Sequence, residues 1–119
     1  MKVTTTEETS ATTQIRFISQ LKGTNIILEG QHAHFECRLE PQNDPSLKIE
    51  WIHNGKPLAA SSRIQTHHDF GYVALDIMDV KKEDAGTYVL HVSNALGQQE
   101  ASIDCKVEAH AQGNVEILD

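Results

Sequence analysis

Short segments of alternating apolar and polar residues recur along the chain, with turn-forming residues roughly every eight to twelve positions. The clearest segment covers residues 31–39, where every second residue from Ala33 to Leu39 is apolar and the intervening residues are polar. The same period of two recurs in other segments, strongly at 47–52, 72–78, 87–93 and 101–108, and more weakly at 16–20 and 25–28. Because a period of two separates the two faces of a strand, the pattern predicts an all-β protein. A sandwich is the favoured architecture, and a barrel is the alternative.

Turn chemistry adds a hairpin to this pattern. Asn54 and Gly55 form the dipeptide that best fits a type I′ turn, in which both central residues have positive φ. A short return strand is predicted at residues 56–59, and Pro57 marks it as an edge strand. No long segment has the 3.6-residue period of a helix, and residues 80–84 allow one helical turn at most.

The two ends of the chain lack the alternation. Residues 1–14 are rich in threonine and glutamate and have little apolar content, which predicts a flexible arm or linker. Residues 108–119 are interpreted as the start of a second linker. The chain has 119 residues, 39% of them hydrophobic and 23% charged, so one globular domain over residues 15–107 is expected between the two ends.

Charge and motifs exclude several classes of function. The formal net charge is −7, which argues against binding to nucleic acid or to anionic membranes. No apolar run reaches the roughly 18–20 residues that a membrane helix needs, and the first residues contain no apolar stretch like that of a signal peptide. The motifs of phosphate-binding loops, serine hydrolases, zinc proteases and dithiol redox sites are all missing from the sequence. We therefore expect a non-enzymatic protein that needs no cofactor.

Three residues have the spacing found in immunoglobulin domains. Trp51 follows Cys37 by fourteen residues and is expected to pack over it as a buried indole. Tyr88 lies in the sequence DAGTYVL (residues 84–90), two positions before the site of the second disulfide cysteine, where a tyrosine corner is expected. Arg63 and Asp84 resemble the structural ion pair that such domains often place beneath this corner.

The second cysteine of the usual disulfide is replaced by Leu90. Cys105 points inward on the last strand, but it is expected beside the strand of Leu90 rather than opposite Cys37. We therefore predict no disulfide and two reduced thiols within a core that includes Cys37, Trp51, Leu75, Tyr88, Leu90 and Cys105. The usual disulfide would join positions 37 and 90 and close a loop of roughly fifty residues, which would stabilise the domain by about 4 kcal/mol. A secreted domain seldom gives up such a bridge, and a cytosolic domain cannot keep it.

Residues 15–107 resemble the intracellular intermediate-set (I-set) immunoglobulin domains of giant sarcomere proteins. The motifs that carry this resemblance are EGQ (29–31), AHFE (33–36), IEW (49–51), NGKPL (54–58), DAGTY (84–88) and NALG (94–97). Residues 40–45 and 68–77 are similar to repeats of kettin and sallimus, which are invertebrate titin-like proteins. The resemblance implies two packed antiparallel sheets with Greek-key connections.

The resemblance also implies a function. Domains of this class are strung by linkers along thin filaments near the Z-disc, and contacts with filamentous actin and other sarcomere proteins are shared over many repeats. We expect a structural module in the cytoplasm of the sarcomere (Z-disc or I-band) that is monomeric when isolated. The alternatives are a cell-surface adhesion or receptor domain and an immunoglobulin domain of a kinase-type giant muscle protein.

Histidines are the first candidates for a binding site. His32 and His34 share one face of their strand, Asp76 is expected opposite them, and residues 67–69 (HHD) form a second cluster. A zinc site needs three or four converging ligands, and the sequence shows only pairs. Solvent-facing histidines and no metal site are therefore expected. Cys37 and His34 do not form a nucleophile–base pair, because strand parity sends them to opposite faces.

Two short segments are candidates for partner contact. Phe70 and Tyr72 flank a glycine ahead of a predicted strand, and aromatic residues are favoured anchors in interfaces. The alternative for Phe70 is that it caps the end of the sandwich. Lys81 and Lys82 form a basic pair that is suited to an acidic filament, although such pairs are more often simply solvated.

Overall fold

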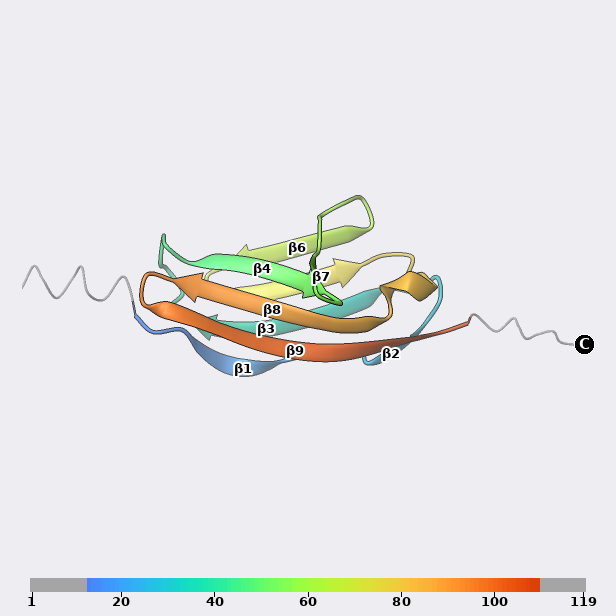
Figure 1. Cartoon of the computed structure of the whole chain (residues 1–119), viewed down its shortest axis with the longest axis horizontal. Helices are drawn as coiled ribbons and strands as arrows, with labels where there is room; N and C mark the ends of the chain where they lie inside the picture. The colour runs from blue at the N-terminus through green and yellow to red at the C-terminus, as the bar shows by residue number, and fades with distance from the viewer. Residues whose placement is uncertain (1–12, 110–119) are drawn as a thin grey trace, which may run out of the picture.

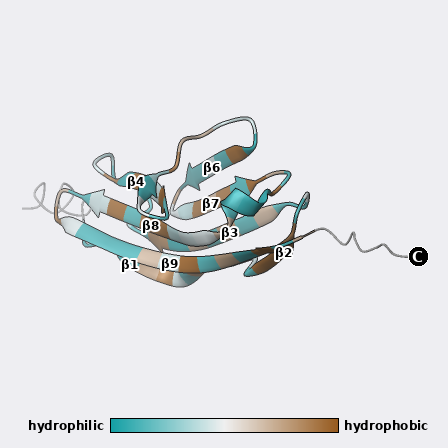
Figure 2. Cartoon of the chain, turned by 45° about the vertical axis from the view of Figure 1, so that its right-hand side comes forward, coloured by the Kyte–Doolittle hydropathy of each residue, from teal (hydrophilic) through white to brown (hydrophobic). Residues whose placement is uncertain are grey.

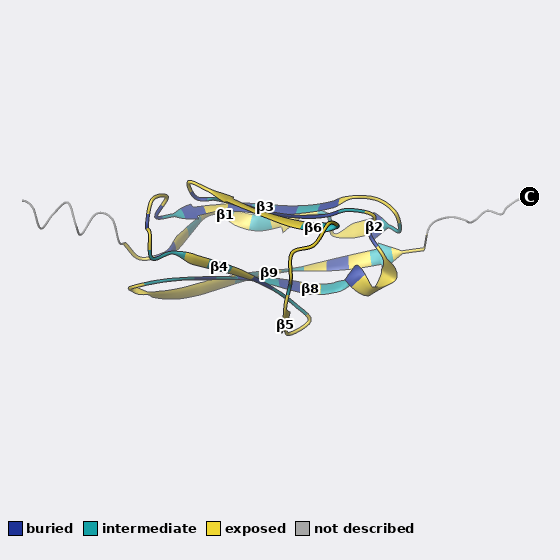
Figure 3. Ribbon diagram, turned by 90° about the horizontal axis from the view of Figure 1, so that it is seen from above, coloured by how far each residue is buried: buried dark blue, intermediate teal, exposed yellow. Residues whose placement is uncertain are grey.

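The computed structural model describes residues 13–109, which form two β-sheets packed face to face (Figures 1 and 3). One sheet has four strands in the order β1 (Arg16–Gly23), β3 (Ala33–Glu40), β7 (Tyr72–Ile77) and β6 (Ile64–Asp69). The other sheet has five strands in the order β2 (Ile26–Leu28), β9 (Gly97–Glu108), β8 (Gly86–Asn94), β4 (Lys48–His53) and β5 (Lys56–Pro57). The predicted sandwich is thus confirmed, and the alternative of a single closed barrel is wrong.

Among residues 13–109, strand pairing is antiparallel except at one place. β2 and β9 run parallel, with Ile26 opposite Lys106 and Leu28 opposite Glu108. Because β2 starts shortly after β1 and β9 is the last strand, this parallel pair joins segments from near the two ends of the domain. Figure 1 shows β1 beginning at one end of the sandwich and β9 ending at the other.

Most predicted strands are found close to their predicted bounds. The single helical turn is a 3₁₀ turn, η1 (Lys82–Asp84), and β5 ends two residues before the predicted return strand does. β1 is longer than predicted and pairs with β3 as far as Gly23 through two irregularities in register. β6 was not predicted: five of its six residues are exposed, because it forms the free edge of the four-stranded sheet and needs no apolar face.

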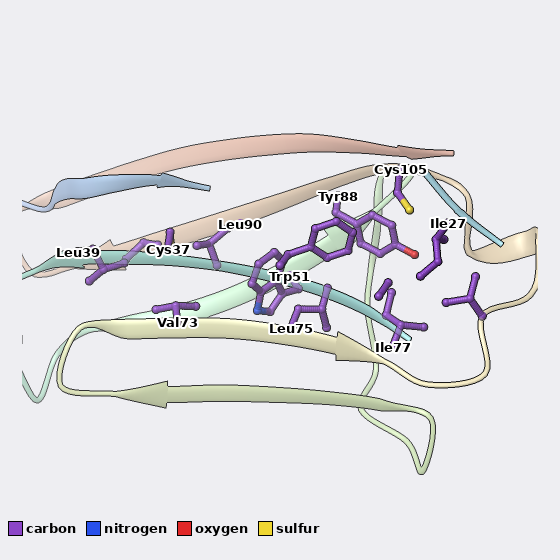
Figure 4. Packing of buried hydrophobic residues seen from close by; sticks show 14 of the residues in the cluster. Ile27, Cys37, Leu39, Trp51, Val73, Leu75, Ile77, Tyr88, Leu90 and Cys105 are labelled. Atoms are coloured by element: carbon purple, nitrogen blue, oxygen red, sulfur yellow. The ribbon is translucent and has the colours of Figure 1, made fainter. Parts of the chain in front are cut away.

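The core lies between the inner faces of the sheets (Figure 4). Colouring by hydropathy shows apolar and polar residues alternating along the second half of β9, as the sequence predicts (Figure 2). Trp51 on β4 is 3% exposed and lies opposite Leu90 on β8, which is fully buried. Cys37, Leu75, Tyr88 and Cys105 belong to the same cluster.

Both cysteines are buried and free, and Figure 4 shows them toward opposite ends of the labelled core. Cys37 lies opposite Val73 on β7, whereas Cys105 lies opposite Gly86 at the start of β8. Burial raises the pKa of the Cys37 thiol to about 11. A buried thiol with a raised pKa is the opposite of an activated nucleophile.

The two ends of the described chain are tied into the sandwich. Asn94, at the β8–β9 turn, donates its side-chain amide to the carbonyl oxygen of Thr13 at 2.6 Å. At the other end, the amide of Glu29 donates to the carbonyl oxygen of Glu108 at 2.9 Å. The predicted arm (1–14) and linker (108–119) fall outside the described residues, except for 13, 14, 108 and 109. Among residues 13–109, no helix is long and apolar enough to cross a membrane.

Candidate functional site

A tyrosine corner joins η1 to β8. The Tyr88 hydroxyl donates to the carbonyl oxygen of Asp84, and burial of this ring raises the pKa of the phenol. The Asp84 carboxylate accepts hydrogen bonds from Arg63 Nη1 at 2.9 Å and from the Lys81 amide at 2.8 Å. Arg63 also donates to the Met78 carbonyl oxygen at 3.1 Å. One buried carboxylate thus fixes the segment that displays the two lysines.

His53 supports this corner from the neighbouring strand. Its ring stacks on Tyr88 with 4.3 Å between centroids and 8° between planes, and Nε2 donates to the Ala85 carbonyl oxygen at 2.8 Å. The next residue, Asn54, accepts from the Thr87 amide through Oδ1 at 3.0 Å. Asn54 and Gly55 have φ values of 50° and 84°, as a type I′ turn requires. Sequence reasoning predicted the turn but missed His53, because a lone histidine before a turn follows no pattern.

Phe70 is exposed at the tip of the β6–β7 turn. Its side chain retains 67% of its accessible surface, so the alternative in which Phe70 caps the sandwich is wrong. Phe70 and Gly71 both have positive φ, at 47° and 83°. Gly71 is required there, because a Cβ atom would overlap the Leu39 carbonyl oxygen. The tight turn leaves Phe70 pointing away from the core.

The Tyr72 side chain is fixed by contacts with two neighbouring side chains. Its hydroxyl donates to Glu36 Oε1 at 3.0 Å, and the Arg38 guanidinium lies 5.1 Å from the ring centroid. Burial and the hydrogen bond to Glu36 together raise the pKa of the phenol. The predicted aromatic pair therefore consists of one fixed, half-buried ring and one exposed ring.

The two predicted contact segments lie at opposite ends of β7. Phe70 precedes β7, next to the end of β3, where the Leu39 amide donates to the Gly71 carbonyl oxygen at 2.8 Å. Lys81 and Lys82 follow β7 and are exposed at the start of η1, where Lys81 Nζ lies 3.6 Å from an Asp79 carboxylate oxygen. The structure therefore does not bring the aromatic and basic residues into one patch.

The outer face of the four-stranded sheet holds a cluster of histidines around Asp76. His32 Nε2 and His34 Nδ1 both donate to Asp76 Oδ1, at 2.7 and 2.6 Å. His67 Nε2 lies 3.2 Å from Asp76 Oδ2. His34 Nε2 also donates to Glu36 Oε1 at 2.8 Å. These three histidines keep much of their surface exposed to solvent, as expected, but they also converge on one carboxylate, which the sequence does not predict.

The hydrogen bonds of this cluster favour the ionised forms of its members, with His34 protonated and Asp76 and Glu36 deprotonated. Hydrogen bonds to Asp76 and then Glu36 raise the pKa of His34. Burial opposes ionisation of Asp76, but its hydrogen bonds from His34 and His32 outweigh this effect and lower its pKa. Hydrogen bonds from His34 and Tyr72 lower the pKa of Glu36.

A third buried carboxylate, Asp44, organises the end of the sandwich near residue 13. Asp44 Oδ1 accepts from the Ser46 amide and hydroxyl, both at 2.8 Å, and Oδ2 accepts from Asn94 Nδ2 at 3.1 Å. Burial opposes ionisation, but these hydrogen bonds outweigh it and lower the pKa of Asp44. Asn94 thereby links the β3–β4 connection to Thr13.

Comparison with known proteins identifies a family profile and several relatives that match this chain. The sequence profile of the immunoglobulin I-set domain matches residues 15–107. The chain is 53% identical over 105 residues to titin of Drosophila melanogaster, which covers 88% of this chain and 1% of the relative. A titin homolog of Caenorhabditis elegans is 36% identical over 70% of the chain, which amounts to 0% of that relative after rounding. The muscle M-line assembly protein unc-89 of the same worm is 28% identical over 87% of the chain and 1% of its own length.

A solved structure agrees with these sequence relatives. The crystal structure of the titin M10–obscurin-like 1 immunoglobulin complex superposes with a TM-score of 0.73 at 25% identity, covering 81% of this chain and 95% of that chain. The chain therefore spans only a small fraction of the giant relatives it matches, but it covers nearly the whole of one chain of this solved immunoglobulin complex. It is an immunoglobulin domain of titin-like type, from a class whose members are structural, protein-binding and typically non-enzymatic. On this evidence of sequence and fold, the chain belongs to the immunoglobulin I-set family.

Proposed function

We propose that this domain is a load-bearing link in a titin-like filament protein of the sarcomere. The observation that carries this proposal is the parallel β2–β9 pair between segments near opposite ends of the domain. A pull on the two chain ends draws β2 and β9 in opposite directions along their own axes. The hydrogen bonds between the strands then lie across the pull and are loaded together.

Two backbone hydrogen bonds flank the paired residues of β2 and β9. The Lys106 amide donates to the Asn25 carbonyl oxygen at 2.7 Å, and the Glu29 amide donates to the Glu108 carbonyl oxygen at 2.9 Å. Ile27, in the middle of β2, is 4% exposed and anchors the short strand in the core. Resistance to force therefore combines a few shared hydrogen bonds with the burial of one apolar side chain.

Partner binding by this domain is proposed to be weak and additive. Phe70 and the pair Lys81 and Lys82 lie at opposite ends of β7, so neither offers the buried centre of a standard interface. A net charge of −7 further opposes tight contact between one copy and an acidic filament. Several copies on one chain gain affinity through effective concentration. We propose filamentous actin as the partner, with sites in the Z-disc or I-band.

The two buried free thiols support a location in the reducing cytoplasm of muscle rather than at the cell surface. Relatives named as titin and as a muscle M-line assembly protein support the same location. By contrast, a cell-surface immunoglobulin domain would be expected to use the space at Leu90 for a disulfide.

Cosedimentation with filamentous actin tests this proposal. The comparison is between this chain and a tandem of three copies, at equal concentration of domains and at two salt concentrations. We expect little pelleting of the single copy and a more than proportional increase for the tandem, reduced by Phe70→Ser or Lys81→Glu in every copy. A Leu96→Ser tandem is the matched control, because Leu96 is an exposed apolar residue in a different turn. Tight binding by one copy, or no gain on linking, contradicts the proposal.

A further inference from the structure

The histidine cluster on the outer face of the four-stranded sheet lies in the sheet that does not contain the β2–β9 pair. Three potential ligand atoms, His32 Nε2, His34 Nδ1 and Asp76 Oδ1, all lie within 4.8 Å of one another. His34 and Asp76 are directly opposite on neighbouring strands β3 and β7, and His32 immediately precedes β3. A paired sheet therefore fixes the backbone positions of these donors.

We propose that His32, His34 and Asp76 form a binding site for one Zn²⁺ ion. Imidazole nitrogen combined with a single carboxylate suits Zn²⁺ and related first-row cations, whereas Mg²⁺ and Ca²⁺ prefer all-oxygen sites. On binding, the ion takes the place of the two hydrogen bonds to Asp76 Oδ1. His34 releases its Nδ1 proton to solvent and keeps the proton on Nε2, and His32 binds through Nε2 as the neutral tautomer with its proton on Nδ1. Three protein ligands and one water complete a tetrahedral Zn²⁺ site.

The spacing fits with a small opening of the cluster. Tetrahedral ligands at about 2.0–2.1 Å from zinc are separated by about 3.3 Å. The two hydrogen bonds to Asp76 Oδ1 measure 2.7 and 2.6 Å, so each imidazole must move outward by roughly 0.6 Å from Asp76 to admit the ion. The His32 and His34 side chains retain 51% and 39% of their surface, which leaves room for this movement and for access from solvent.

The surrounding residues match the outer shell of a metal site. A histidine that binds metal through Nδ1 keeps its proton on Nε2, and His34 Nε2 donates to Glu36 Oε1 at 2.8 Å. Glu36 is itself oriented by the Tyr72 hydroxyl at 3.0 Å. On the other side, His67 Nε2 lies 3.2 Å from Asp76 Oδ2, which leaves Oδ1 directed at His32 and His34. This carboxylate–histidine arrangement holds the proposed ligand in the required tautomer.

Isothermal titration of the 119-residue chain with ZnCl₂, with no polyhistidine tag on the protein, tests the site. We expect one saturable site per chain, together with a higher melting temperature in Zn²⁺ because the ion binds the folded state. His32→Asn and His34→Asn should each weaken binding by roughly tenfold or more, and Glu36→Gln by about tenfold. MgCl₂ and CaCl₂ should give no saturable binding.

His68→Asn is the matched control. His68 is the neighbour of His67 on the same edge strand, but it lies opposite Val73 and so has the parity of the other face of the sheet. The His68→Asn chain should bind Zn²⁺ like the unchanged chain. Histidine-selective nuclear magnetic resonance spectra should show that Zn²⁺ shifts the ring nitrogens of His32 and His34.

Three results overturn the proposal. These are the absence of a saturable site, equal binding by the His32→Asn chain, and loss of binding in His68→Asn as large as in His34→Asn. His32 is half-exposed, so its substitution is expected to leave the fold intact and provides a test even if His34→Asn fails to fold.

Discussion

Trp51 and Leu90 lie opposite each other on the neighbouring strands β4 and β8, both buried, and Leu90 stands where immunoglobulin domains usually have the second cysteine of the disulfide between the sheets. Packing of an aliphatic side chain has taken over the position of the covalent link. Truncation of Leu90 to alanine should therefore destabilise the domain by about 2–5 kcal/mol, the cost of a core cavity. Unfolding in urea measures this loss as a lower midpoint. A midpoint equal to that of the unchanged chain would show that the β8 register assigned here is wrong.

Restoring the missing cysteine tests the same position in the opposite direction. Leu90→Cys should give Cys37 a partner across the sheets, and the oxidised protein should melt at a higher temperature than its reduced form. Cys105→Ser in the same chain prevents the wrong pairing and serves alone as the control. Thiol titration should fall from two free thiols to none on oxidation of the double variant. Two thiols that remain free and an unchanged melting temperature would refute this expectation.

The corner ion pair should contribute more than an exposed pair does. Arg63→Met leaves the Asp84 carboxylate, whose side chain is 9% exposed, without its guanidinium partner, so a loss of about 1.5–3 kcal/mol is expected. Arg16→Met is the matched control, because Arg16 and Glu40 form a pair of equal length whose side chains are 73% and 43% exposed. That change should cost about 0–1 kcal/mol. Equal losses in denaturant titrations would mean that burial does not strengthen the corner pair.

Asp44 predicts a specific acid sensitivity. Its pKa is lowered in the folded state, so its contribution to stability is present above the pKa of the unfolded chain, about 3.9. This contribution is lost as pH falls through the folded pKa. The stability difference between the unchanged chain and Asp44→Asn should therefore shrink between pH 6 and pH 3. Asn94→Ala removes one hydrogen-bond donor to Asp44, so the acid sensitivity of this variant should lie between that of the unchanged chain and that of Asp44→Asn. A difference that stays constant over this range would exclude a role for the Asp44 charge.

The sequence predicts most of the sandwich because the strands that build its core have one apolar face. β3 shows this best, since Phe35 and Cys37 face the core while His34 and Glu36 face outward. β6 was missed because an edge strand with five exposed residues has no such contrast. Turn geometry decides the exposure of Phe70, and no pattern in the sequence encodes it.

The candidate sites were predicted in part for the same reason. Strand parity placed His32, His34 and Asp76 on one face without any structure. The third histidine, His67, joins them only through the pairing of β6 with β7, in which Gln65 lies opposite Asp76. Because β6 itself was not predicted, the sequence showed pairs where the structure shows a cluster.

Single-molecule pulling from handles at the two chain ends tests most directly whether the β2–β9 pair bears load. Lys106→Pro removes the amide that donates to the Asn25 carbonyl oxygen, and Lys106 lies beyond the β8–β9 pairing. Ser61→Pro is the control, because it removes an amide hydrogen bond in an exposed loop outside this pair. We predict that Lys106→Pro unfolds at a clearly lower force at the same pulling speed, while Ser61→Pro unfolds like the unchanged chain. Equal unfolding forces for Lys106→Pro and the unchanged chain would contradict the account.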